Sequence, residues 1–204
     1  MTKRPYTKNR RAELEAETRE RIVHAAVALH AEHGGLGTSY AMIAQRAQVS
    51  PQTVYNHFPG QDTLFGACTG HVLAKAPPLG PESFRSGRTP ADRLRLLAKA
   101  VYARHDYLAP WMRKSFYEAA LSPELGAIVD RGNTALRELI AAAPAPERVP
   151  AAGFVEAAFV LLDFPAWKEF SHRRSSSDAA RLAGECLARL LPALTRPAPR
   201  KEKP

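Results

Sequence analysis

Apolar side chains recur at the spacing of helical turns along this chain, and this pattern constrains the fold more than any other feature. Ile22, Ala26 and Leu29 show it in the first third, and Leu94 and Val101 show it further along. Residues at such spacing share one face of a helix, so the pattern predicts amphipathic helices. Since no alternating, β-branched stretch competes with it, the sequence predicts an all-α fold without internal repeats.

Proline clusters at 77–81, at 144–150 and near the C-terminus separate the helical segments. Proline cannot continue a helix and restricts the residue before it. The sequence predicts helices over these ranges: 13–33, 38–47, a short helix beginning at 51, 61–75, 90–109, 122–143, 151–172 and 178–195.

The positive charge is distributed unevenly. The formal net charge is +9, which favours a nucleic-acid partner. Residues 1–11 carry five Lys or Arg and no acid, whereas residues 12–62 carry three basic and six acidic residues. We therefore expect a basic N-terminal arm, residues 1–17, in front of a body that is not basic.

Several classes of protein are disfavoured by what the chain lacks. Its longest plain apolar run, AAFVLL, is far shorter than a membrane span, and no secretory signal is evident, so a cytoplasmic location is expected. Cys68 and Cys186 lack zinc-site spacing and are interpreted as buried thiols. His24, His30 and His33 share one helix without completing a metal set, and no nucleophile or phosphate-loop motif is present. The prediction is a protein without enzymatic activity, metal or cofactor.

The stretch VSPQTVYNHFPGQDTL, residues 49–64, is the most informative one. Ser50 followed by Pro51 predicts a helix start, because serine can cap free amides and proline lacks one. Val54 and Phe58 lie one turn apart and predict the buried side, which Tyr55 is expected to join. The remaining face carries uncharged hydrogen-bonding side chains: Gln52, Thr53, Asn56 and His57. A packing helix would usually carry charges there.

The predicted helix 38–47 precedes this one with a tight connection between them. Two short helices joined in this way, the second presenting polar groups, are typical of a helix-turn-helix. The second helix of that motif fits the DNA major groove, where Gln and Asn bond base edges.

Residues 18–64, with the runs HGGLGTS, IAQRAQVS and TVYNHF, closely resemble the DNA-binding domain of TetR-family transcriptional regulators. The resemblance implies a homodimeric, ligand-responsive regulator, usually a repressor, that binds a double-stranded DNA operator. It also implies that the following residues contact DNA: Thr38, Ser39, Tyr40, Ser50, Gln52, Thr53, Tyr55, Asn56 and His57.

Two positions depart from the family pattern. Gln48 stands in the turn where the family commonly has glycine, and must tolerate an unusual backbone conformation or shift the turn. Gln61 stands where the family often has a phosphate-binding lysine. A compensating contact from the arm is expected through its basic side chains: Lys3, Arg4, Lys8, Arg10 and Arg11. A solubilising tail with no DNA contact has the same composition.

The expected domain organisation follows the helices. The arm is followed by a helix-turn-helix DNA-binding domain at 18–62, a helical ligand-binding and dimerisation domain at 63–196, and a flexible tail at 197–204. We expect the last two helices to pair with their copies in the dimer, and the helix 61–75 to link the two domains.

Aromatic residues of the second half are either plain core or the lining of an effector cavity. Polar groups among them could orient a ligand, namely His105, Asp106, Glu118 and Asp163. The candidates for an effector site are Tyr102, His105, Trp111, Phe116, Tyr117, Phe159, Asp163 and Trp167. Asp163 is the strongest, because Pro165 predicts a kink beside it. If the second half has a solid core, a ligand-independent or architectural DNA-binding protein is the alternative, and a partner of another protein is a further one.

Overall fold

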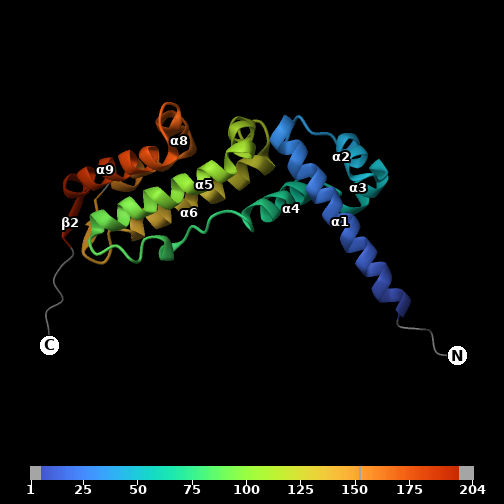
Figure 1. The fold of residues 1–204 in the computed structure, drawn as a ribbon, viewed down its shortest axis with the longest axis horizontal. Helices are drawn as coiled ribbons and strands as arrows, with labels where there is room; N and C mark the ends of the chain where they lie inside the picture. Colours follow the sequence, from blue (N-terminus) through green and yellow to red (C-terminus); the bar gives the residue numbers. More distant parts are fainter. Residues whose placement is uncertain (1–5, 152, 198–204) are drawn as a thin grey trace. The chain divides into compact units, whose positions relative to one another are not determined.

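The computed structural model describes residues 6–151 and 153–197, and helices dominate these residues (Figure 1). The predicted all-α fold class is confirmed. The described residues form two compact units. The first comprises the residues up to Lys75 together with Pro110–Val129, and the second comprises Ala76–Ala109 and the residues from Asp130 onward.

The first unit contains α1 (Tyr6–His33), α2 (Tyr40–Ala47), α3 (Pro51–His57) and α4 (Gln61–Leu73). Both short helices begin at serine caps, as predicted for α3: Ser39 accepts from the Met42 amide, and Ser50 accepts from the Thr53 amide. One buried cluster joins the four helices: Ile22, Val23, Ala25, Ala26, Leu29, Ile43, Ala44, Ala47, Val54, Phe58, Leu64 and Cys68. The helix-turn-helix therefore has its own core.

Helix α1 begins earlier than predicted. The sequence indicated a helix from about residue 13, whereas α1 runs from Tyr6, so part of the expected arm is helical. Apolar periodicity is absent there, but Ala, Glu, Lys and Arg are strong helix formers and an exposed helix needs no apolar stripe. The predicted helix start near residue 13 was therefore wrong.

Helix α5 (Pro90–Glu118) continues through Pro110, although the sequence predicted its end at Ala109. Proline removes one hydrogen bond of a helix without always ending it. The next helix, α6 (Pro123–Ala142), starts as predicted, since the Ser122 hydroxyl accepts from the Leu125 amide. The first unit contains the end of α5 and the start of α6, and the second contains the remainder of both.

The second unit also contains η1 (Pro81–Ser83), α7 (Phe154–Leu162), α8 (Phe164–Ser171) and α9 (Ser176–Leu194). The last three helices pack against one another. The predicted single helix 151–172 is wrong: Asp163 is extended, with φ −71° and ψ 170°, and separates α7 from α8. Its carboxylate caps α8 by accepting from the Ala166 amide, and Pro165 lies in the first turn of that helix.

Two short strands were not predicted. β1 (Arg148–Pro150) pairs antiparallel with β2 (Thr195–Pro197), with Val149 opposite Arg196. Three residues are too few for a visible alternation of polar and apolar side chains, so the sequence could not indicate them.

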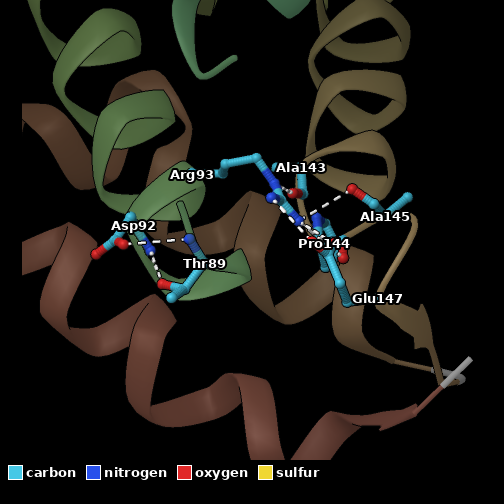
Figure 2. Close-up of polar contacts among 7 residues, drawn as sticks. All are labelled: Thr89, Asp92, Arg93, Ala143, Pro144, Ala145 and Glu147. Atoms are coloured by element: carbon cyan, nitrogen blue, oxygen red, sulfur yellow. Dashed lines mark hydrogen bonds and ion pairs between the residues drawn. The ribbon is translucent and has the colours of Figure 1, made fainter. Parts of the chain in front are cut away.

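Arg93 fixes the end of α6 within the second unit (Figure 2). Its buried guanidinium donates to the carbonyl oxygens of Ala143, at 2.6 Å, and Ala145, at 3.0 Å. Carbonyls at a helix end lack partners within the helix. Arg93 therefore satisfies backbone groups that no helical turn supplies.

Candidate nucleic-acid interface

The turn between α2 and α3 is built around a left-handed residue. Gln48 has φ 55° and ψ 48°. Its amide bonds back to the carbonyls at the end of α2, and the Val49 amide donates to Ala44 at 3.0 Å. Gln48 therefore adopts the conformation that glycine favours, which is the first of the two outcomes expected for this departure from the family pattern.

Helix α3 has a buried side and an exposed polar side. Val54 is 0% exposed and Phe58 1% exposed, as predicted. Gln52 and Asn56 are exposed, and Gln52 Nε2 donates to Asn56 Oδ1 at 3.0 Å. This pair lies one turn apart and presents amide donors and acceptors from one rigid support.

The cap region of α3 contributes further hydroxyls. Ser50 Oγ and Thr53 Oγ1 lie 2.8 Å apart, and both residues retain exposed surface. His57 is partly buried at the end of the helix. With Gln52 and Asn56, these residues form the outward polar surface of α3, which we call the reading face: Ser50, Gln52, Thr53, Asn56 and His57.

The tyrosines differ from their predicted placement. Tyr55 is 52% exposed, so the expectation that its ring joins Val54 and Phe58 on the buried side was wrong. It lies instead against the ring of Tyr40, with centroids 4.6 Å apart. The Tyr40 hydroxyl is buried without a hydrogen-bond partner among the described residues, and burial raises its pKa. Tyr40 therefore supports Tyr55 and does not offer its hydroxyl to a phosphate in this conformation.

Thr38 is also buried, at 7% exposed, and its hydroxyl donates to the Gly34 carbonyl at 2.7 Å. The expected DNA-backbone contact from Thr38 does not fit this placement. The family resemblance implied an accessible hydroxyl at this position, whereas the Thr38 hydroxyl is bonded to the backbone of the preceding loop. Ser39 remains exposed while it caps α2.

The basic residues of the predicted arm are only partly described. Lys3 and Arg4 lie outside the described residues. Lys8 lies on α1, and Arg10 and Arg11 are exposed on the same helix. Arg46 on α2 is paired within the protein, since its guanidinium donates to both carboxylate oxygens of Glu32 at 2.7 and 2.9 Å.

The eight effector-site candidates fall in different units. Trp111, Phe116 and Tyr117 belong to the first unit, and the other five belong to the second: Tyr102, His105, Phe159, Asp163 and Trp167. Tyr117 is 63% exposed. Trp111 Nε1 donates to the Val27 carbonyl of α1 at 2.9 Å.

Most polar groups expected to orient a ligand have protein partners. Asp163 caps α8, and Asp106 accepts from Trp167 Nε1 at 2.9 Å. Glu118 accepts from the amides of Gly35 and Leu36. These polar groups stand out in the sequence by their apolar neighbours, but the sequence does not show which hydrogen-bond partners they have.

His105 differs from these groups. Its Nε2 lies 2.9 Å from the Leu162 carbonyl at the end of α7, while its Nδ1 is buried without a hydrogen-bond partner among the described residues. A carbonyl only accepts, so Nε2 carries the proton. Burial lowers the pKa of this histidine, which favours the neutral ring. Nδ1 is therefore a free acceptor, on an imidazole ring that lies beside the rings of Phe164 and Trp167.

A family model described as bacterial regulatory proteins, tetR family, matches residues 22–68, which include the reading face. Over these residues the chain matches the TetR family. It is 38% identical over 76 residues to the HTH-type transcriptional repressor Rv3405c of Mycobacterium tuberculosis, covering 37% of this chain and 40% of that protein. It is 27% identical over 112 residues to the HTH-type transcriptional regulator BetI of Brucella canis, covering 52% and 54%. The chain thus matches about half or less of these relatives' lengths.

Solved structures extend the likeness over most of the chain. A tetR-family transcriptional regulator from Streptomyces coelicolor has a TM-score of 0.67 at 21% identity, with 87% of this chain and 82% of that chain covered. A transcriptional regulator from Rhodococcus sp. Rha1 has a TM-score of 0.63 at 20% identity, with 85% and 95% covered. At these identities the likeness concerns the fold.

Two further features concern the described residues only. None of their helices is both long and apolar enough to cross a membrane. They also contain no group of three or more His, Cys, Asp or Glu side chains placed to hold a metal ion.

Proposed function

We propose that this chain is a sequence-specific DNA-binding transcriptional regulator of the TetR family whose reading face enters the major groove. The observation that carries the proposal is the pairing of Gln52 with Asn56 on the exposed side of α3, directly above buried Val54 and Phe58. Side-chain amides can bond adenine bidentately, and the rigid base beneath them limits the entropy lost on binding.

We infer that the protein acts as a homodimer on a near-palindromic operator. In this proposal α7, α8 and α9 supply the dimer contact, as the sequence indicated for residues 151–172 and 178–195. Two symmetric copies of a reading face require two symmetric half-sites, about one turn of DNA or somewhat more apart. The mycobacterial relative is named as a repressor, which supports repression as the direction of regulation.

The proposed signal is a small-molecule effector that binds in the second unit and releases the operator. His105 supports this part, since a buried acceptor without a partner is costly and a ligand donor would satisfy it. A coupling free energy of about 1–3 kcal/mol between effector and operator would suffice for such release. Helix α4 connects the reading face to the rest of the chain through buried Leu64, Phe65, Cys68 and Val72.

Selection of bound fragments from a random DNA pool, with the full-length protein, tests the DNA-binding part. We expect enrichment of one near-palindromic sequence, and a dissociation constant at least ~10³-fold below that of a shuffled duplex. Recovery of unrelated sequences with equal affinity would contradict sequence-specific reading.

A ligand-independent DNA-binding protein is the second candidate. The internal partners of Asp106 and Asp163 favour it, because these polar groups need no effector to satisfy them. Thermal denaturation in the presence of a set of apolar and hydroxylated small molecules distinguishes the two functions. A ligand-responsive regulator is stabilised by a compound that also lowers operator affinity, whereas an architectural protein shows no such linked effect.

A further inference from the structure

The last turns of α5 make a row of hydrogen bonds to the backbone of α1 and of the loop after it. Trp111 Nε1 donates to the Val27 carbonyl at 2.9 Å, and Lys114 Nζ donates to the Glu32 carbonyl. Glu118 accepts from the amides of Gly35, at 2.8 Å, and Leu36, at 3.3 Å. The donors and acceptor on α5 are spaced by three and four residues, so they lie on one helical face. We call Trp111, Lys114 and Glu118 the clamp.

The chemistry of the clamp suits the end of a helix. The last carbonyls of α1 lack helical partners and carry the negative end of its dipole, which the Lys114 ammonium complements. The Glu118 carboxylate satisfies two loop amides at once, and hydrogen bonds to a charged group are stronger than neutral ones. The clamp binds backbone atoms of α1 and its loop.

Glycine permits this close approach. Gly34 has φ +85°, and a Cβ on it would collide with the Glu118 carboxylate. Both the backbone conformation and the space therefore exclude an ordinary side chain at this position. The absence of a side chain at Gly34 thus leaves the space that the Glu118 carboxylate occupies.

The clamp adds a second attachment to the helix-turn-helix. Helices α1, α2 and α3 share one buried core with Leu64 and Cys68 of α4, so they move as a body, and the chain leaves this body along α4. A body held by one helix can pivot about that connection. A second set of bonds at the end of α1, made by a different helix, removes that freedom within the first unit.

We propose that the clamp sets the tolerance of the dimer for the distance between operator half-sites, with Glu118 as its principal positioning residue. This inference rests on the proposed dimeric function. In a dimer, the two reading faces are held at one separation only as firmly as each is held within its own protomer. Loss of the clamp leaves each reading face intact and lets the pair accept other spacings.

The test measures full-length protein on the selected operator, on duplexes with the half-sites moved by one or two base pairs, and on a duplex with a single half-site. Glu118→Gln preserves shape but replaces one acceptor oxygen with a donor, and Glu118→Ala removes both acceptors. Glu138→Gln is the matched control, since Glu138 is an exposed carboxylate on α6 outside the clamp. Lys114→Met tests the clamp separately if either Glu118 variant fails to fold.

We expect the wild type and Glu138→Gln to prefer the native spacing strongly. Both Glu118 variants should retain single half-site affinity and base preference, while the preference for native spacing falls roughly tenfold. Amide hydrogen exchange at Gly35 and Leu36 should rise in the same variants.

Two results would overturn the inference while leaving the DNA-binding proposal intact. One is wild-type spacing preference in Glu118 variants whose Gly35 and Leu36 amides exchange faster. The other is an equal loss of affinity for single and paired half-sites, which would show that Glu118 only stabilises the fold. A wild type that binds DNA without preferring any spacing would contradict the dimeric function itself, and the clamp's role with it.

Discussion

Arg93 and Glu147 form an ion pair whose two members lie in different environments: the arginine side chain is 11% exposed and the glutamate side chain 50% exposed. The same guanidinium also satisfies backbone carbonyls after α6 (Figure 2). The hydrogen bond to Arg93 lowers the pKa of Glu147. Arg93 thus carries the structural role, and Glu147 is a partner at its exposed end.

Arg93→Met should lower the free energy of unfolding by about 3 kcal/mol, because buried carbonyls lose their donor. Arg95→Met is the control, since Arg95 lies on the same helix and forms its ion pairs with Glu185 and Asp92 at the surface. That change should cost no more than about 1 kcal/mol. Urea unfolding measures both, and equal losses would contradict the assigned role of Arg93.

Gln48→Gly should stabilise the protein by about 1 kcal/mol, because Gln48 occupies the left-handed region at φ 55° and glycine does so without strain. Gln45→Gly provides the opposite control. Gln45 lies exposed within α2, where glycine should destabilise by about 1 kcal/mol. Thermal denaturation of the two variants should therefore shift in opposite directions, and a loss of stability in Gln48→Gly would show that the turn is not strained.

The burial of His30 predicts a pH dependence. His30 is 9% exposed, and burial lowers its pKa from 6.5 to about 4. As pH falls below 6.5, His30 becomes protonated in the unfolded chain but stays neutral in the folded chain. The free energy of unfolding therefore falls until the pH nears 4. This group alone should reduce stability by about 2 kcal/mol between pH 7.5 and pH 5.

His30→Leu isolates this contribution, because leucine remains neutral in the same apolar surroundings. Urea unfolding at both pH values should show a smaller loss for the variant than for the wild type. Identical losses would mean that other groups cause the acid sensitivity. His105 should act in the same direction in the second unit, since burial lowers its pKa too.

The helix-turn-helix was predictable because its signals are local. Ser50 and Pro51 fix the start of α3 through neighbouring atoms, and the alternation of Val54 with Gln52 decides which side is buried. The sequence likewise limited Gln48 to an unusual backbone conformation or a shifted turn, and the structure has the first. The placement of Tyr55 was not local, because it depends on the ring of Tyr40 in another helix.

The role of α5 was not predictable for the same reason. Arg93, Tyr102 and His105 satisfy carbonyls at the ends of α6 and α7, and the clamp satisfies backbone groups of α1 and its loop. The sequence shows that such side chains stand among apolar residues. It does not show which helix end each one reaches, since those partners are 50 or more residues away in the chain.

Gln52→Ala and Asn56→Ala should each relax base preference at one position of each half-site, by about 1–3 kcal/mol of discrimination. The control is Gln45→Ala, which removes an exposed amide from α2 instead of α3. Competition binding against operators with single base changes measures the preference. If both α3 variants discriminated as well as the wild type, the proposed reading face would be wrong.

Gln61→Lys should strengthen binding to every DNA sequence, because it adds a cation at the start of α4, where the family often has a phosphate-binding lysine. Gln61 is exposed, so the longer side chain requires no repacking. One added phosphate contact should make the slope of log affinity against log salt steeper by about 1. Thr134→Lys adds the same charge at an exposed position of α6 and should leave the slope nearly unchanged.

Removal of residues 1–11, with their five basic side chains, should make the slope of log affinity against log salt shallower and weaken binding to all DNA sequences alike. An unchanged slope after that deletion would leave the basic segment without a role in DNA binding, and the reading face would then act without an arm.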